Sequence, residues 1–424
     1  MKKFKLISVM LLTVITLAAQ YNVINTTHYS PSLNQEKPVK IYLPPDYYTD
    51  STEHYPVIYF LHGAGNDQTS YPGFVSWTQS LINNETIHPV IVVFVNGDCP
   101  PYWGSVYANS ALYGNYEDYI VYDLVTFIDT TFRTIPERPY RCITGHSMGG
   151  GGSAKLAIKH PDIYRGFASH AGIMNFDTVL TLWQPIILQE NGGSPTYNYY
   201  WGAGTYTNFI FTGAGGWSPN LNNPETFVDF PYDSLGNVIN CILMKWKQHD
   251  NSSIIKQISP ADNLGIFFSC STEDQHQLYP TNEMFRDTLV MLGLDYTFLT
   301  TTGDHNLSPE MIQAGMVFLD SIMFIATGTN EALSNQHSFV VKFSVNPNPV
   351  FNETEIIIEL TENIITTLDI LDMTGKVLES YKDPGKRTDK IDLKINLSGL
   401  YPGIYFCRVK MGNEMVTKKI IKVR

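Results

Sequence analysis

Short apolar runs alternate with longer stretches of mixed polarity between residues 20 and 326. Runs that are short, apolar and closed by a polar or turn residue indicate strands, and such runs occur at 39–43, 57–61, 90–95, 142–144, 167–169, 265–268 and 296–300. Helices are expected between them, over 74–83, 117–132, 150–159, 281–292 and 309–324. Continuous apolar strands that alternate with helices are typical of a parallel sheet covered on both faces. The pattern therefore predicts a three-layer α/β domain over 20–326.

One long segment, residues 186–255, interrupts this alternation. It is rich in Asn, Gly, Pro, Tyr and Trp, as in 197–201. Long irregular segments in compact domains usually carry function. We therefore expect it to form an elaborated excursion above the sheet. Together with the loop at 102–107, which holds Tyr102 and Trp103, it is expected to determine specificity.

The pattern changes after residue 326. Residues 327–342 are polar and non-periodic, which fits a linker. Short strand-like runs separated by turn residues then follow at 356–358, 368–370, 375–377, 391–393 and 404–406. This spacing predicts a small all-β, sandwich-like domain over 343–424. The segment contains no His and no cluster of carboxylates, so we expect no chemistry there.

The N-terminal residues have the layout of a secretory signal peptide. Residues 1–5 are basic, residues 6–17 form an apolar run, and Ala18-Ala19-Gln20 offers small residues for cleavage. The apolar run is shorter than the ~20 residues that a membrane span needs. No later segment reaches that length. We therefore expect a signal peptide at 1–19 and a secreted protein without a stable membrane span.

Composition narrows the class of protein. The chain has 424 residues, 43% apolar and 16% charged, which is enough apolar material for a sizeable core. The net charge of −12 comes without a basic stripe, so nucleic acid is not an expected partner. The five cysteines are odd in number and lack CxxC spacing. Export permits one disulfide, but nothing selects the pair, and Cys142 and Cys270 are expected to be buried free thiols.

The segment GHSMG at 145–149 matches the nucleophile elbow GxSxG. It follows an expected strand and opens an expected helix with Gly149-Gly150-Gly151-Gly152. A sharp turn from strand to helix needs small residues on both sides of the serine. The start of a helix also favours developing negative charge. The motif therefore predicts Ser147 as a nucleophile.

A serine nucleophile needs a base and an acid, which follow it in the order acid, then His. Of His160, His170, His249, His276 and His305, only His305 follows the last expected strand, so it is the predicted base. His170 ends the strand after the elbow, and we expect it to line the substrate pocket with His146.

The acid is expected after the penultimate strand, which the segment 271–274 follows. Asp274 is the predicted acid and Glu273 is its competitor. Asp304 ranks third, because the side chain of a neighbouring residue usually points away from His305.

An oxyanion hole needs two preorganised N–H donors. One is the N–H of Met148, after the nucleophile. The other is expected from the loop HGAG at 62–65, where glycines allow close backbone approach and Ala64 is the candidate donor. The segment 274–276 is too short for a zinc site, and a serine hydrolase needs no metal. We expect no cofactor.

Several segments together resemble the putative-esterase family of α/β-hydrolases, which includes esterase D-like enzymes, feruloyl and acetyl-xylan esterases and mycolyltransferases. They are VKIYLPP at 39–45, YFLHG at 59–63, GNYEDYI at 114–120, RTIP at 133–136, GHSMGG at 145–150, and the acid and histidine positions. The resemblance implies an α/β-hydrolase fold. It also implies a triad of Ser147, Asp274 and His305, with Ala64 and Met148 as oxyanion donors. One departure is STED at 271–274, where relatives often carry Gly-Thr-x-Asp.

The C-terminal segment resembles the sorting domain of the type IX secretion system. The matching pieces are VNPNP at 345–349, DMTGKV at 372–377, LSGLYPGIY at 397–405 and KKIIK at 418–422. The resemblance implies passage across the outer membrane with the secretion machinery as a partner. A carbohydrate-binding β-module is the alternative interpretation.

These observations predict a secreted or surface-exposed serine esterase that travels through the periplasm. Its expected substrates are acyl or feruloyl esters on plant polysaccharide. An acyl transferase or a peptidase of the same fold is one alternative. A non-catalytic glycan-binding surface protein is another, against which the intact serine, histidine, acid and elbow glycines argue.

Overall fold

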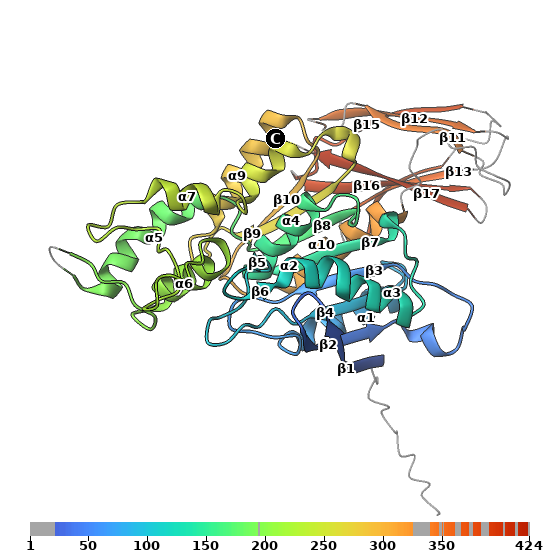
Figure 1. Cartoon of the computed structure of the whole chain (residues 1–424). Coiled ribbons are helices and arrows are strands. Elements are labelled where there is room, and N and C mark those ends of the chain that lie inside the picture. The colour runs from blue at the N-terminus through green and yellow to red at the C-terminus, as the bar shows by residue number, and fades with distance from the viewer. Residues whose placement is uncertain are drawn as a thin grey trace, which may run out of the picture.

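A computed structural model describes 22–193, 196–324, 340–346, 350, 352–360, 366–372, 376–382, 390–401, 403–411 and 414–422. Its main element is an eight-stranded sheet of order β1-β2-β4-β3-β7-β8-β9-β10 (Figure 1). The strands are β1 (Asn22–Ser30), β2 (Gln35–Leu43), β3 (Val57–Leu61), β4 (Ile91–Val95), β7 (Arg141–His146), β8 (Gly166–His170), β9 (Gly265–Ser271) and β10 (Thr297–Thr301). From β4 to β10 the strands run parallel, as predicted.

The antiparallel hairpin β1–β2 at one edge was not anticipated in full. Strand β2 pairs antiparallel with β4, and β1 pairs with β2 over nine residues on its outer side. The sequence analysis found only the apolar end of β2. Strand β1 carries polar residues at most positions and is largely solvent-accessible, so it lacks the apolar run that indicates a buried strand.

Helices cover both faces of the sheet, which confirms the three layers. They are α1 (Pro72–Asn83), α2 (Tyr116–Asp118), the π-helical η2 (Tyr119–Leu124), α3 (Val125–Thr131), α4 (Met148–Lys159), α9 (Tyr279–Leu292) and α10 (Pro309–Phe324). Alternate residues of β3 enter two separate cores. Tyr59 and Leu61 pack with α3, α4 and α9, whereas Ile58 and Phe60 pack with α1 and α10. Burial on both sides explains why the strands are apolar throughout.

The connection from β8 to β9 forms a helical lobe (residues 172–193 and 196–264) that projects from the sheet (Figure 1). It contains α5 (Phe176–Asn191), α6 (Thr205–Trp217), α7 (Asn240–Trp246) and α8 (Asn251–Ile254). The expected irregular excursion at 186–255 is thus partly helical, which corrects the sequence analysis. The sequence does not indicate α6 as a helix because it contains several glycines. Packing requires one of them, since a Cβ on Gly215 would lie 2.0 Å from the Tyr113 hydroxyl.

Shorter elements complete this domain. They are the hairpin β5 (Asn109–Ser110) and β6 (Gly114–Asn115), and the 3₁₀ turns η1 (Pro45–Tyr48), η3 (Arg138–Tyr140), η4 (Ile255–Gln257) and η5 (Pro260–Asp262). The five cysteines are free thiols, and Cys142 and Cys270 are buried, as expected. Among the described residues, we find no helix that is both long and apolar enough to cross a membrane.

The C-terminal residues form two small antiparallel sheets, of order β11-β12-β15 and β14-β13-β16-β17. Their strands are β11 (Val340–Asn346), β12 (Glu353–Leu360), β13 (Thr366–Leu371), β14 (Val377–Lys382), β15 (Lys390–Asn396), β16 (Gly403–Met411) and β17 (Glu414–Lys422). Ile356 and Ile358 from one sheet share a core with Leu368 and Val409 from the other, which confirms the sandwich.

Two expected segments fall largely outside the described residues. They are the signal peptide at 1–19 and most of the linker at 327–342. Strand β11 already begins at Val340, inside the expected linker. The limits of these segments stay predictions.

Candidate active site

Ser147 lies at the sharp turn between β7 and α4. Its backbone has φ 57° and ψ −118°, a conformation that side-chain-bearing residues rarely adopt. The flanking glycines make this turn possible. A Cβ on Gly145 would lie 2.3 Å from the Gly149 carbonyl oxygen, and one on Gly149 would lie 2.0 Å from the Leu61 carbonyl oxygen. The helix therefore packs directly against the strand ends and presents the serine hydroxyl above them.

The structure brings Ser147, His305 and Asp274 into one hydrogen-bonded chain. His305 Nε2 lies 2.8 Å from Ser147 Oγ, and His305 Nδ1 lies 2.6 Å from Asp274 Oδ2. Because an ionised carboxylate only accepts hydrogen bonds, Nδ1 donates and Nε2 is left to accept the serine hydroxyl proton. This arrangement can deprotonate Ser147 as it attacks a carbonyl carbon.

The loops after β9 and β10 carry the acid and the base. The Asp274 side chain is fully buried against His305. Burial acts to raise the pKa of Asp274, but the hydrogen bond from His305 and the charge of its ring hold that pKa below its ordinary value. Glu273 is exposed, and Asp304 is exposed and bonded to Asn306, whereas the carboxylate that bonds to the His305 ring is that of Asp274.

Ala64 and Met148 lie beside the serine and line the same pocket. Ala64 belongs to the β3 loop (residues 62–71). Among the described residues, the N–H groups of Gly63 and Gly65 donate to Tyr71 Oη and to the Trp103 carbonyl, while that of Ala64 has no acceptor. The N–H of Met148 is in the first turn of α4, where N–H groups have no partner within the helix. Both groups can therefore donate to an anionic oxygen.

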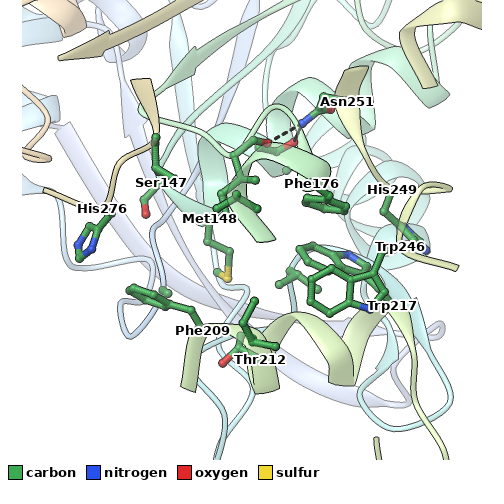
Figure 2. A pocket seen from close by; sticks show the side chains of 18 of the residues that line it. Ser147, Met148, Phe176, Phe209, Thr212, Trp217, Trp246, His249, Asn251 and His276 are labelled. Atoms are coloured by element: carbon green, nitrogen blue, oxygen red, sulfur yellow. Dashed lines mark hydrogen bonds between the residues drawn. The ribbon is translucent and has the colours of Figure 1, made fainter. Parts of the chain in front are cut away.

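An apolar pocket of about 800 Å³, its open mouth included, extends from Ser147 along α4. Gly151, Gly152 and Lys155 of α4 line one side, and the helical lobe lines the other. Figure 2 shows Ser147 and His276 on one side, and Trp217 and Trp246 on the opposite side. The lobe residues of the lining are Ile173, Phe176, Val179, Trp183, Phe209, Ile210, Thr212, Trp217, Trp246, His249 and Asn251.

A buried lysine stabilises another part of the pocket wall. Val106 and Tyr107 both have positive φ, 46° and 53°. Lys155 Nζ donates to the carbonyl oxygens of both, at 3.2 and 2.6 Å. Burial lowers the pKa of Lys155 to about 8, against the opposing effect of Glu117. Two adjacent strained residues are thus held by one ammonium group of α4.

The four residues expected to line the pocket have other positions. His170 is buried, with Nδ1 2.8 Å from Ser269 Oγ, and His146 faces the main chain of His305. Tyr102 donates its hydroxyl hydrogen to the Thr226 carbonyl. Trp103 packs edge-on against Phe209, which lines the pocket, and so supports the wall from behind. Adjacent residues on a strand face opposite sides, so His146 at the end of β7 points away from α4.

Sequence reasoning missed His276 as a pocket residue, because it weighed this histidine only as a candidate base and as part of a metal motif. Its ring lies edge-to-face 4.6 Å from that of His305, and its Nδ1 is buried without a partner among the described residues. Burial, and then the neighbouring His305, lowers the pKa of His276. The aromatic lobe residues were indicated only by the composition of the excursion. No group of metal-binding side chains occurs within the described ranges.

Comparison with known proteins assigns the family. The family model described as "Putative esterase" matches residues 30–291. The chain belongs to this esterase family. The chain also matches the family "Secretion system C-terminal sorting domain" over residues 344–423, which points to export from the cell or to its surface.

Curated relatives match only part of the chain. An esterase of Mycobacterium tuberculosis is 33% identical over 135 residues, which cover 32% of this chain and 28% of that protein. An endo-1,4-beta-xylanase/feruloyl esterase of Xylanibacter ruminicola is 29% identical over 152 residues, which cover 34% of this chain and 20% of that protein. The chain thus spans between a fifth and just over a quarter of these relatives' lengths.

A solved ferulic acid esterase shares the fold. It superposes with a TM-score of 0.52 at 18% identity, over 72% of this chain and 99% of the other. At this identity the likeness concerns architecture alone, and it agrees with the α/β-hydrolase fold.

Proposed function

We propose that this protein is an exported serine esterase that hydrolyses carboxylic esters through an acyl-enzyme. One observation carries the proposal: Ser147, His305 and Asp274 form a hydrogen-bonded chain whose first two members line an apolar pocket. A serine paired with a base and an orienting acid is the arrangement that nucleophilic acyl transfer requires.

The reaction follows from the directions of these hydrogen bonds. Ser147 Oγ bonds to the ester carbonyl carbon as His305 Nε2 takes its proton, and the carbonyl electron pair moves to oxygen. The N–H groups of Ala64 and Met148 face that oxyanion. The carbon–oxygen bond to the alcohol then breaks, and the alcohol takes the proton from His305. Water, deprotonated by the same nitrogen, releases the acid and restores Ser147.

We propose acyl groups on plant polysaccharide, aromatic ones in particular, as the substrates. The pocket is lined mostly by apolar and aromatic side chains, which suits a flat acyl group better than a sugar. One relative is an endo-1,4-beta-xylanase/feruloyl esterase. A sorting domain accords with a substrate outside the cell.

A panel of esters tests this proposal. We expect the purified enzyme to hydrolyse nitrophenyl acetate, acetylated xylan and methyl ferulate, with the highest kcat/KM for the feruloyl ester because it fills the pocket. The Ser147→Ala protein provides the background rate. Rates no higher than this background on every ester would refute an esterase function, and a preference for acetyl esters would refute the aromatic substrate.

Trp217 is expected to discriminate between long and short acyl groups. It lies at the opposite side of the pocket from Ser147 and packs on Phe176 and Trp246, with ring centroids 4.5 and 4.9 Å apart (Figure 2). A ring contact is worth about 1.4 kcal/mol, or tenfold in affinity. Trp217→Ala should therefore lower kcat/KM for methyl ferulate about tenfold and leave that for nitrophenyl acetate within about twofold.

The matched control for Trp217 is Trp77, a tryptophan on α1 that is 38% exposed and does not line the pocket. Trp77→Ala should change neither rate. Equal losses on both esters in the Trp217 variant would mean that this side of the pocket does not contact the acyl group.

Removal of the C-terminal domain should separate activity from export. The apolar clusters of the two domains share no residue, and separate cores usually fold independently. A chain that ends after Phe324 should keep its esterase activity but accumulate in the periplasm. Fractionation of native host cells that express each form measures this. Equal amounts of both forms outside the cell would contradict a sorting role, and weaker adsorption to polysaccharide would then indicate a glycan-binding module.

A further inference from the structure

Three hydrogen bonds behind Ser147 connect the β3 loop with the β10 loop (residues 302–308). The N–H of Gly63 donates to Tyr71 Oη over 3.1 Å. Tyr71 Oη lies 3.0 Å from His146 Nδ1, and His146 Nε2 lies 2.7 Å from the His305 carbonyl oxygen. These three bonds form a hydrogen-bonded path that begins beside Ala64, passes through Tyr71 and His146, and ends on the main chain of His305.

The chemistry of these groups fixes the direction of every bond. The carbonyl oxygen of His305 can only accept, so His146 Nε2 carries a hydrogen. Nδ1 of a neutral ring is then an acceptor, and Tyr71 donates its hydroxyl hydrogen to it. Tyr71 Oη accepts in turn from Gly63. Burial, and then His305, lowers the pKa of His146 to about 3, so the ring stays neutral.

This path does not take part in the reaction itself. Although His146 precedes Ser147 in the chain, its two ring nitrogens bond to Tyr71 and to the main chain of His305. Neither Tyr71 nor His146 lines the pocket. Both residues nevertheless lie close to the site, because a Cβ on Gly63 would lie 3.0 Å from Tyr71 Oη and 3.3 Å from Ser147 Cβ.

The two loops that the path connects are far apart in the sheet. The strands β7, β8 and β9 lie between β3 and β10. The β10 loop contains exposed residues, among them Gly303 with φ 111°. The Gly303 carbonyl accepts from Ser271 Oγ, and the His305 N–H donates to Gln275 Oε1, so these two bonds hold the loop to the end of β9 and not to the β3 loop. Transfer of a proton and stabilisation of an oxyanion both depend strongly on position.

We propose that Tyr71 and His146 are positioning residues that hold the main chain of His305 in register with the N–H of Ala64. The proposal rests on the proposed function, in which these two groups act on the same substrate carbonyl. It predicts that breaking these hydrogen bonds lowers kcat and leaves KM nearly unchanged, because the positions of His305 and Ala64 matter most in the transition state.

Tyr71→Phe is the first test. It keeps the ring, which packs on Phe60, and removes the hydroxyl through which the path passes. We expect kcat to fall about tenfold, the effect of one lost hydrogen bond, and KM to stay within about twofold. The matched control is Tyr164→Phe: Tyr164 is fully buried, and its hydroxyl has no partner among the described residues. That variant should retain wild-type kcat.

Two substitutions at His146 test the same path from its centre. His146→Phe preserves an aromatic ring and removes both nitrogens, so kcat should fall at least as far as in Tyr71→Phe. His146→Gln restores a neutral group with one donor and one acceptor, and should recover most of the loss. Because both residues act in one path, the double variant Tyr71→Phe/His146→Phe should be little slower than His146→Phe alone.

Thermal unfolding and the Ser147→Ala protein separate the possible results. A tenfold loss of kcat in Tyr71→Phe, with an unfolding midpoint like that of Tyr164→Phe, supports positioning. If Tyr71→Phe and Tyr164→Phe have the same kcat, whether both equal the wild-type value or both are reduced, the positioning role is overturned. The Tyr71→Phe result decides the question even if His146→Phe fails to fold. If Ser147→Ala retains activity, the proposed function is refuted. If Ser147→Ala is inactive and Tyr71→Phe has the kcat of its control, only the positioning role is refuted.

Discussion

Ser147→Ala is expected to lower ester turnover by about four to six orders of magnitude while the fold persists. The hydroxyl of Ser147 is the group that His305 Nε2 contacts, at 2.8 Å, and alanine offers no atom that could bond to the substrate carbon. The hydrolysis of nitrophenyl acetate by the purified variant measures this loss, and circular dichroism reports the fold.

Ser153→Ala is the matched control for this substitution. Ser153 is buried on the same helix, and its hydroxyl donates only to the Gly150 carbonyl within α4. Its loss should leave turnover within about threefold of the wild-type value, because a single local hydrogen bond contributes little. A folded Ser147→Ala protein with near wild-type turnover would place the nucleophile elsewhere.

Asp274→Asn should lower turnover about 10⁴-fold, since an amide in place of the acid favours the wrong tautomer of the histidine. Asp274 Oδ2 accepts the Nδ1 hydrogen of His305 over 2.6 Å. An asparagine that turned its NH₂ group to this position would move the ring hydrogen to Nε2, where the base must be free. Ester turnover of Asp274→Asn and of Glu273→Gln, measured as a function of pH at matched enzyme concentration, gives the loss.

Glu273→Gln tests the neighbouring carboxylate under the same conditions. Glu273 is exposed and does not contact the His305 ring, so the substitution should change turnover by no more than about twofold. The opposite ranking of the two variants would give Glu273 the role of orienting acid.

The sequence was sufficient to predict the parallel strands, because burial on both faces leaves a continuous apolar run at each. Strand β1 and helix α6 were not predicted from the sequence, for opposite reasons. Strand β1 is stabilised by pairing along its length with β2, which polar side chains permit. Helix α6 contains glycines that weaken a helix in isolation, while its packing against Tyr113 requires one of them.

The convergence of Ser147, Asp274 and His305 could be anticipated, because parallel strands bring their C-terminal ends to one edge of the sheet. The partners of His146 could not, since Tyr71 and the main chain of His305 reach its ring only through the folding of the β3 and β10 loops. The residues of the pocket wall could not be predicted from the sequence either. Phe209 and Trp217 come together with α4 only through the packing of the lobe.

The position of the helical lobe has an evolutionary consequence. The lobe has a core of its own, is joined to the sheet through β8 and β9, and supplies most of the wall opposite α4. The proposed reacting groups come instead from the ends of β7, β9 and β10. Substitutions that reshape the lobe can accumulate without disturbing the sheet. Descendants of one ancestral esterase could therefore diverge in the acids they release while inheriting the same reacting groups.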